Sequence, residues 1–424
     1  MDAFIYRGQS GARELGSDGV SLTAIAEAVG TPFYGYSSGA LEARYSAFAE
    51  ALAPAKARIC YAVKANDNLA VIRTFARLGA GADVVSEGEM QAALKAGIAP
   101  DQIVFSGVGK TASDMAAALD CGIGQFNVES EPELERLAEI AKAKGKRAAI
   151  AFRINPDVDA GTHEKIATGR KRDKFGVPYD QASALYARAA THASLQVVGV
   201  AMHIGSQLTR LDPFEAAFER AAILVEKLRG EGHAISRLDL GGGLGIVYHN
   251  ETPPSLSDYG ALLARIQQRL GIEITVEPGR WLVGPAGVLV ARVVYVKHNG
   301  EKTFVIVDAA MNDLIRPTLY GAHHRILPLR EAPTNAPLET VDVVGPVCES
   351  GDVLAFGRPL PKLESGDLIA LLDTGAYGAV MASAYNGRPP APEVLIKDGN
   401  YAVVRPRLSI PALLARDELP EWLR

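Results

Sequence analysis

Short apolar runs alternate with longer amphipathic stretches between about residues 58 and 277. Apolar runs that end in polar breaks are typical of buried strands in a parallel sheet. Eight strand–helix alternations favour closure into a barrel over an open doubly wound sheet. The expected strands are 59–63, 82–85, 103–106, 125–128, 148–153, 197–202, 237–240 and 273–276.

The segment 131–143 carries the clearest helix signal between these runs. Glu131 and Glu133 lie early in it and its lysines lie late, which matches the direction of a helix dipole. Pro132 suits the first turn of a helix, and Ser130 is a plausible N-terminal cap. We therefore expect a helix over 131–143.

After Val288 the rhythm changes to strand-like runs separated by turn residues. The expected strands are 288–296, 303–307, 340–344, 368–372 and 401–406, with helical pattern scarce outside 409–416. The pattern predicts an α/β protein with two domains. A TIM-like (β/α)₈ barrel would span 37–286, and a mainly β domain, resembling a β-barrel or sandwich, would combine 1–36 with 287–424.

Length and composition agree with this division. The chain has 424 residues, and single cores seldom grow this large. Its formal net charge of -5 gives no support for nucleic-acid binding, and no apolar stretch approaches membrane-spanning length. The three cysteines, Cys60, Cys121 and Cys348, are too widely spaced for a zinc or disulfide pattern. A cytoplasmic, reducing location is the simplest expectation.

Polar residues gather at the carboxyl ends of the predicted strands, where barrel enzymes place their active sites. Buried charge is costly without a partner, so convergence of this kind is hard to explain as core filling. These residues are Lys64, Asp83, Arg153, His203, Gly241, Gly242, Gly243 and Glu277.

Lys64 follows the apolar run 59–63 directly. Partial burial disfavours the ammonium form of an amine, which suits a lysine that attacks an aldehyde. Most lysines are simply solvated, so Lys64 alone is weak evidence. Asp83, at the end of the next strand, is a candidate to support it.

The other strand ends offer complementary groups. Backbone N–H groups of Gly241–Gly243 could cradle a phosphate, although a tight turn without a ligand explains the glycines equally well. Glu277 could hold a proton on a ring nitrogen, and Arg280 could bind an anion, but a surface Glu–Arg pair is the alternative. His203 could stack on a flat cofactor, or it could be structural. Together these groups describe a pyridoxal phosphate site.

The chain resembles the diaminopimelate decarboxylase family, within the alanine-racemase-like (fold-type III) group of pyridoxal phosphate enzymes. The similarity extends over nearly the whole chain in the expected order. It is carried by YAVKAN (61–66), FSGVGKT (105–111), FNVESEPEL (126–134), RINPDVDAGTH (153–163), KFGV (174–177), HIGSQ (203–207), LGGGLG (240–245), EPGR (277–280), MNDLIRPTLYGAHH (311–324), GPVCESGD (345–352) and DTGAYGAVMASAYNGRPP (373–390). One stretch, 164–167, departs from the family pattern.

The resemblance implies specific roles. Lys64 would bond the cofactor's aldehyde, Glu277 would pair with its ring nitrogen, and His203 would stack on the ring. Cys348 would donate a proton after carbon dioxide leaves. The family forms homodimers with shared sites, so Cys348 and Glu349 of one chain would act at the Lys64 of the other chain. The groups implied around the phosphate are Ser206, Gly241, Gly242, Gly243, Gly279, Arg280 and Tyr377.

Substrate choice is a problem of charge matching. The far end of meso-diaminopimelate carries a carboxylate and an ammonium group. Arg280, Arg316 and Tyr320 resemble the family's contacts to the carboxylate, and Glu349 resembles its ammonium partner. The resemblance also implies that Tyr377 contacts the substrate. The expected reaction is decarboxylation to L-lysine, the last step of lysine biosynthesis by this route. The alternative interpretation is that Arg316 is a solvated loop residue without a role in binding.

Three alternatives stay open. A related decarboxylase could act on ornithine, arginine or carboxynorspermidine, and such a substrate would leave Arg316 without a distal carboxylate to bind. A non-catalytic pyridoxal phosphate-binding regulator would tend to lose the lysine or the acid, whereas Lys64, Glu277 and Cys348 are all present. A metal-dependent hydrolase could use His203 and Asp239, but no spaced set of metal ligands accompanies them.

Overall fold

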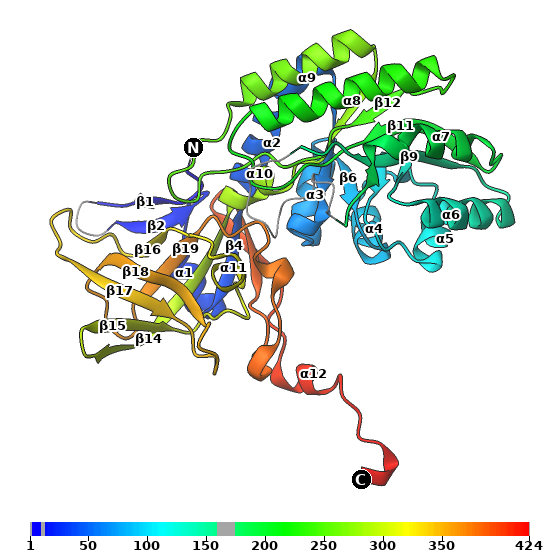
Figure 1. Ribbon diagram of the computed structural model, residues 1–424. Coiled ribbons are helices and arrows are strands. Elements are labelled where there is room, and N and C mark those ends of the chain that lie inside the picture. The colour runs from blue at the N-terminus through cyan, green and yellow to red at the C-terminus, as the bar shows by residue number, and fades with distance from the viewer. Residues whose placement is uncertain (1, 10–12, 159–173, 424) are drawn as a thin grey trace. The chain divides into compact units, whose positions relative to one another are not determined.

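The computed structural model describes residues 2–9, 13–158 and 174–423. The chain divides into two compact units. The barrel unit is Glu42–Leu282, and the β unit combines Met1–Leu41 with Val283–Arg424. Figure 1 labels their elements along the chain.

In the described part of the barrel unit, eight parallel strands form a closed barrel, as predicted. β13 pairs with β5 and β8 pairs with β9, so the sheet has no open edge among these strands. The strands are β5 (Arg58–Ala62), β6 (Gly81–Val84), β7 (Ile103–Phe105), β8 (Gln125–Val128), β9 (Ala148–Asn155), β11 (Leu195–Ala201), β12 (Arg237–Asp239) and β13 (Glu273–Val276). A two-residue strand, β10 (Val177–Pro178), extends β9 on one side.

Helices follow most of the barrel strands, and side-chain caps begin several of them. Ser86, Thr111, Ser130 and Ser255 each accept a hydrogen bond from a backbone N–H in the first turn of the helix that follows. The helices are α2 (Ser38–Leu52), α3 (Leu69–Arg77), α4 (Glu87–Lys95), α5 (Ala112–Cys121), α6 (Glu131–Ala143), α7 (Ala182–Ala190), α8 (Asp212–Gly230), α9 (Leu256–Leu270) and α10 (Arg280–Val283). The helix predicted over 131–143 is confirmed, with Ser130 as its cap.

The described residues of the β unit form two sheets. β1 (Ile5–Arg7), β2 (Glu14–Ser17) and β3 (Val20–Ser21) form a small antiparallel sheet. The larger mixed sheet contains β4 (Phe33–Ser37), β14 (Gly287–Asn299), β15 (Lys302–Val307), β16 (Ile326–Pro328), β17 (Leu338–Val344), β18 (Val353–Pro361), β19 (Leu368–Leu372), β20 (Glu393–Lys397) and β21 (Asn400–Arg405). Its helices are α1 (Leu22–Val29), α11 (Arg316–Tyr320) and α12 (Ile410–Leu414).

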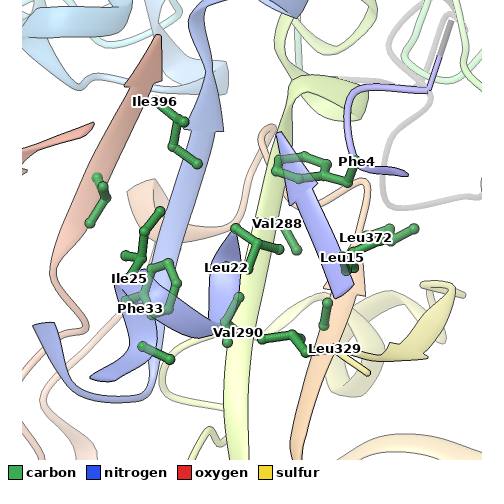
Figure 2. Close-up of a cluster of buried hydrophobic side chains, with 13 residues drawn as sticks. Phe4, Leu15, Leu22, Ile25, Phe33, Val288, Val290, Leu329, Leu372 and Ile396 are labelled. Atoms are coloured by element: carbon green, nitrogen blue, oxygen red, sulfur yellow. The ribbon is translucent and has the colours of Figure 1, made fainter. Parts of the chain in front are cut away.

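The long strand β14 organises the larger sheet. Its first half pairs with β4 and β19, and its second half pairs with β15. Side chains from β4, β14 and β19 pack with helix α1 in a buried cluster that includes Phe33, Val288 and Leu372 (Figure 2). Burial of such side chains is the main force that holds a sheet and a helix together.

Candidate active site

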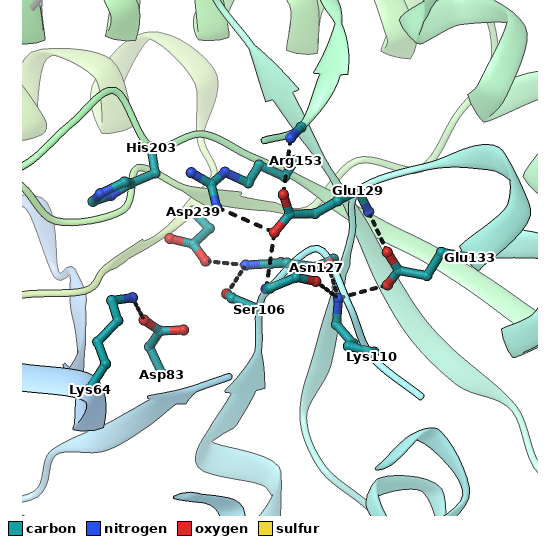
Figure 3. A network of polar contacts seen from close by, with 12 residues as sticks. Lys64, Asp83, Ser106, Lys110, Asn127, Glu129, Glu133, Arg153, His203 and Asp239 are labelled. Atoms are coloured by element: carbon teal, nitrogen blue, oxygen red, sulfur yellow. Dashed lines mark hydrogen bonds and ion pairs between the residues drawn. The ribbon is translucent and has the colours of Figure 1, made fainter. Parts of the chain in front are cut away.

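Lys64 lies in a single turn of 3₁₀ helix, η2 (Val63–Ala65), directly after β5. Its Nζ atom is 2.6 Å from Oδ2 of Asp83, which lies in β6 (Figure 3). The Asp83 side chain is fully buried, whereas that of Lys64 is 35% exposed. Lys64 is therefore held by a buried charged partner and is partly shielded from solvent.

Asp239 and Glu277 end the adjacent strands β12 and β13 and are both buried. Burial raises the pKa of Glu277 well above its usual range, and the neighbouring Asp239 and Asp83 raise it further. Burial also raises the pKa of Asp239, although less, because hydrogen bonds from Glu277, Asn127 and Gly241 oppose it. Two carboxyl groups in hydrogen-bonding contact therefore lie at the end of the barrel that carries Lys64.

His203 follows β11, and its ring is tied to the glycine run. Nδ1 of His203 accepts a hydrogen bond from the backbone N–H of Gly242, at 3.1 Å. Burial lowers the pKa of His203 well below its usual range, and the positive charges of Arg153 and Lys64 lower it further. The imidazole is therefore neutral near pH 7, with its hydrogen on Nε2.

The glycines after β12 are required by close packing. A methyl group on Gly241 would lie 2.5 Å from the carbonyl oxygen of Met202, and one on Gly242 would overlap the carbonyl oxygen of Glu277. The N–H groups of Gly241 and Gly242 bind Asp239 and His203. The tight-turn explanation thus accounts for these two glycines, and any role in binding phosphate is additional to it.

Arg280 stands at the start of α10 and is buried. Its guanidinium donates to Oγ of Ser206 at 2.9 Å and to the hydroxyl of Tyr248 at 2.8 Å. These contacts exclude the surface Glu–Arg pair considered for Arg280. Tyr248 was not among the predicted site residues, because nothing in its local sequence signals the contact. Gly279, just before Arg280, packs against the side chains of Ala62 and Ala65.

A second polar network lies beside this site (Figure 3). Nζ of Lys110 is fully buried and donates to the carbonyl oxygens of Gly107 and Asn127 and to Glu133. Arg153 pairs with Glu129 at 3.3 Å. The backbone N–H of Glu129 donates to Glu133, which joins the two ion pairs into one network.

The predicted substrate residues Arg316 and Tyr320 lie in the β unit, on helix α11. Arg316 is 4% exposed, so the interpretation of it as a solvated loop residue is wrong. Its Nε atom donates to Nε2 of the fully buried His324, at 3.3 Å, and Nδ1 of His324 contacts the carbonyl oxygen of Leu372. His324 is a supporting residue that the sequence reading missed. Tyr320 is partly buried.

Cys348, Glu349 and Tyr377 also belong to the β unit. Cys348 and Glu349 are exposed in the single chain, and the Cys348 backbone N–H donates to Oδ1 of Asn386. Tyr377 is partly buried and has a positive φ of 55°. Exposure of Cys348 sets it apart from the usual small buried cysteine.

Two other findings concern the described residues only. They contain no group of three or more His, Cys, Asp or Glu side chains placed to hold a metal ion. None of their helices is both long and apolar enough to cross a membrane. The atypical stretch 164–167 and part of the motif at 153–163 lie outside the described residues.

The closed parallel barrel brings a paired lysine, a buried acid and a neutral imidazole to its strand ends, and this set of groups is suited to binding pyridoxal. Residues 38–284 match the family model described as "Pyridoxal-dependent decarboxylase, pyridoxal binding domain". This match defines the class of protein.

The particular family follows from whole-chain similarity. The chain is 51% identical to diaminopimelate decarboxylase of Pseudomonas aeruginosa over 422 residues, which cover 99% of each chain. The crystal structure of diaminopimelate decarboxylase from M. jannaschii in co-complex with L-lysine has a TM-score of 0.93, at 36% identity and 99% coverage of each chain. The Helicobacter pylori enzyme complexed with L-lysine has a TM-score of 0.89, at 43% identity, covering 93% of this chain and 98% of that one. The chain belongs to the diaminopimelate decarboxylase family.

The residues present fit pyridoxal phosphate. Oε1 of Glu277 is buried and accepts no hydrogen bond from an N–H or O–H group of the described residues. Because a buried polar atom without a partner is unfavourable, this carboxyl group is suited to a ring nitrogen that carries a proton. Arg280 and Ser206 add a cation and a hydroxyl at the neighbouring strand end, as an anionic phosphate needs.

Proposed function

We propose that the protein decarboxylates meso-2,6-diaminopimelate to L-lysine and carbon dioxide, the last step of lysine biosynthesis by the diaminopimelate route, with pyridoxal phosphate as cofactor. The observation that carries the proposal is the Lys64–Asp83 ion pair at 2.6 Å, close enough to the buried Glu277 for both residues to influence its pKa. The named relatives support the choice of substrate, and the two L-lysine complexes among them support the choice of product.

Lys64 would bond the aldehyde of the cofactor, and Asp83 would orient the amine for that bond. Glu277 would bind the ring nitrogen and His203 would lie against the ring face. A neutral imidazole suits that position, because a positive charge on the ring's face would draw electrons away from it. When bound, pyridoxal phosphate supplies an electron sink for the pair of electrons left as carbon dioxide departs.

The phosphate would bind beside Ser206 and Arg280, with the glycine run 241–243, Gly279 and Tyr377 around it. Arg280 is already oriented by two hydrogen bonds, so little side-chain freedom would be lost on binding. Its planar guanidinium offers paired donors to an anion. The residues of the chain would thus hold the cofactor at both ends and keep its aldehyde within reach of Lys64.

Recognition of the substrate's far end would fall to the β unit. Arg316 would bind the distal carboxylate with help from Arg280, Tyr320 and Tyr377, and Glu349 would bind the distal ammonium group. Burial of Arg316 supports a specific role, since a buried guanidinium is costly unless its partners are well placed. Ornithine and arginine carry no distal carboxylate and would leave this donor set unsatisfied, which disfavours them strongly.

We further infer that two copies of the chain complete each site. Cys348 would deliver a proton to the substrate carbon that has lost carbon dioxide, acting at the partner's Lys64. The exposure of Cys348 and Glu349 in the single chain supports this, because residues that serve another subunit must be accessible to it. The three free cysteines favour a cytoplasmic, reducing location.

The direct test is mass detection of lysine from diaminopimelate by the purified chain, with and without added pyridoxal phosphate. Ornithine and arginine at equal concentration should give far less product. Lys64→Ala should abolish borohydride trapping of the cofactor and lower turnover by about a thousandfold or more, as expected for removal of a covalent nucleophile. The matched control is Lys95→Ala, an exposed lysine on helix α4. Wild-type turnover by Lys64→Ala would refute the proposal.

A further inference from the structure

Asp239 and Glu277 form a buried carboxyl pair whose two members differ in their hydrogen-bond donors. The residues are 1% and 7% exposed, respectively, and lie at the ends of neighbouring parallel strands. Two carboxylates in contact within a protein interior cannot both be ionised without a large penalty. The pair must therefore hold at least one proton near neutral pH.

The hydrogen-bond donors around the pair are on the Asp239 side. Oδ2 of Asp239 accepts from Nδ2 of Asn127 and Oδ1 accepts from the backbone N–H of Gly241, both at 3.0 Å. Oε1 of Glu277 has no N–H or O–H donor among the described residues. Because donors stabilise a carboxylate, the negative charge belongs on Asp239 and the proton on Glu277.

The surrounding charges fit a pair that carries one negative charge. Lys64 lowers the pKa of Glu277 by its positive charge, while Asp83 raises it, and the two form an ion pair with each other. Asp239 and Glu277 both influence Cys60 on β5, and Asp239 influences Tyr259 on α9. The pKa of each of these two groups is raised, chiefly by burial, so both are neutral at pH 7. Nothing among these groups compensates a second negative charge on the pair.

We propose that Asp239 is a positioning residue for Glu277, and that the two carboxyl groups share one proton that changes sides when Glu277 binds a protonated ring nitrogen. In the cofactor-free chain the proton is bonded to Glu277 and hydrogen-bonded to Asp239. When Glu277 accepts the ring N–H, its own O–H bond breaks and an O–H bond forms on Asp239. The pair gains and loses no proton, and its charge is the same in both states.

This inference rests on the proposed function, since the ring belongs to pyridoxal phosphate. Its consequence is that Glu277 is never a bare buried carboxylate. Without the cofactor it is a neutral acid, and with the cofactor it is an anion that receives hydrogen bonds from both sides. Asn127 takes part by holding Asp239 in place, and its Nδ2 atom also donates to Oγ of Ser106.

Infrared difference spectra of the full chain can follow the proton directly. Samples carry ¹³C-carboxyl glutamate or ¹³C-carboxyl aspartate, with pyridoxal phosphate removed and then restored. Without the cofactor, we expect a protonated glutamate signal at neutral pH that Glu277→Gln abolishes. Restoring the cofactor should remove that signal and produce a protonated aspartate signal. In Asp239→Asn the midpoint of the glutamate signal should fall by about one pH unit or more, because a neighbouring negative charge is gone.

A second variant guards against failure of Asp239→Asn to fold. Asn127→Ala removes one of the two donors to Asp239, so in the cofactor-free chain the protonated glutamate signal should weaken and a protonated aspartate signal should appear beside it. The control Glu89→Gln removes another carboxyl group, whose pKa of about 7 leaves it partly protonated at neutral pH, and should leave the Asp239-dependent signal unchanged. An ionised Glu277 in the wild type, or a midpoint insensitive to Asp239→Asn, would overturn the inference.

The spectra need no substrate, so they separate the two proposals. If the proton moves as described but diaminopimelate is not decarboxylated, only the proposed reaction is refuted. If lysine is formed while Glu277 is ionised without the cofactor, only the proton-sharing pair is refuted. A chain that binds no pyridoxal phosphate would overturn both.

Discussion

Lys64 and Asp83 are joined across two neighbouring barrel strands, with Nζ of the lysine 2.6 Å from Oδ2 of the aspartate. In the parallel pairing of β5 and β6, Asp83 lies opposite Ala62, which is two residues before Lys64 in the chain. Asp83 thus lies in a barrel strand, and Lys64 lies in the short helical turn that directly follows the neighbouring strand. Rigid strands hold a reactive group more accurately than loops do.

This relationship gives the first prediction. Asp83→Asn keeps the size of the side chain but removes its charge, so the Lys64 amine loses its orientation. A hydrogen bond to a charged group contributes about 1.5 kcal/mol, so we expect kcat/KM to fall roughly tenfold. Steady-state assays at saturating cofactor would measure the change, with the exposed Asp101→Asn as the control. An unchanged rate would show that Lys64 needs no such partner.

The second prediction concerns substrate recognition. Arg316→Gln removes a buried guanidinium that His324 holds from one side. The KM for diaminopimelate should rise about a hundredfold, because a charged hydrogen-bonded pair is worth about 2–3 kcal/mol. The visible spectrum of the bound cofactor should stay the same. Arg330→Gln, at an exposed site in the same unit, is the matched control. Equal loss of activity and of cofactor binding would argue for a structural role instead.

The third prediction tests whether sites are shared between two chains. Lys64→Ala and Cys348→Ala are each expected to be nearly inactive alone. If they are mixed after mild dissociation, half of the dimers should be hybrids with one intact site, which gives about a quarter of wild-type activity for a two-fold symmetric pair. Mass spectrometry of differently tagged chains would count the hybrids. No recovery in a mixture that contains hybrids would place both residues in the site of the same chain.

How far the sequence predicted this molecule depends on whether a feature is local. The barrel strands were found within a few residues because each is a short apolar run followed by a polar break. By contrast β18, which contains Gly357, Pro359 and Pro361, was missed. It forms a strand because β17 pairs with it, and pairing of that kind leaves no local pattern.

The site shows the same division. Lys64 and Glu277 could be predicted because they end apolar strands, where barrel chemistry takes place. The hydrogen bond between Asn127 and Asp239 joins residues 112 positions apart, and the contact of Tyr248 with Arg280 depends on a loop folding back. Such contacts arise only when the barrel closes, and the periodicity of the chain contains no signal for them.

The fourth prediction is a pH dependence of stability. Burial raises the pKa of Glu89 to about 7, although a hydrogen bond from the backbone N–H of Val85 partly opposes this rise. A carboxyl group whose pKa is raised on folding contributes stability that is complete below about pH 4.5 and is lost as the pH rises through about 7. Glu89→Gln should therefore increase the unfolding free energy at pH 8 by about 1 kcal/mol.

Urea denaturation between about pH 5 and pH 8 would measure this effect, because the folded and unfolded states bind different numbers of protons in that range. The variant should show a smaller fall in stability across that range than the wild type. Glu87→Gln, in the same first turn of α4, should leave the pH profile unchanged. Parallel profiles for wild type and Glu89→Gln would mean that Glu89 is ionised in the folded protein at acidic pH.

The last prediction compares a buried with an exposed ion pair. Lys110 donates to Glu133 at 2.6 Å with both side chains buried, whereas Lys144 and Asp120 form a pair of similar length at the surface. Lys110→Met should cost about 3–5 kcal/mol, because it leaves Glu133 buried without a counter-ion. Lys144→Met should cost less than about 1 kcal/mol. Denaturant midpoints at constant m-value would measure both.

The double variant Lys110→Met with Glu133→Gln decides what the loss means. Replacing the carboxylate by a neutral amide removes the buried charge, so part of the stability should return if the uncompensated charge was the cause. Lys110 also donates to the carbonyl oxygens of Gly107 and Asn127, and these bonds are lost in either variant. Complete recovery would assign the whole cost to the charge, and no recovery would assign it to the two carbonyl groups, which support the strand end that carries Asn127.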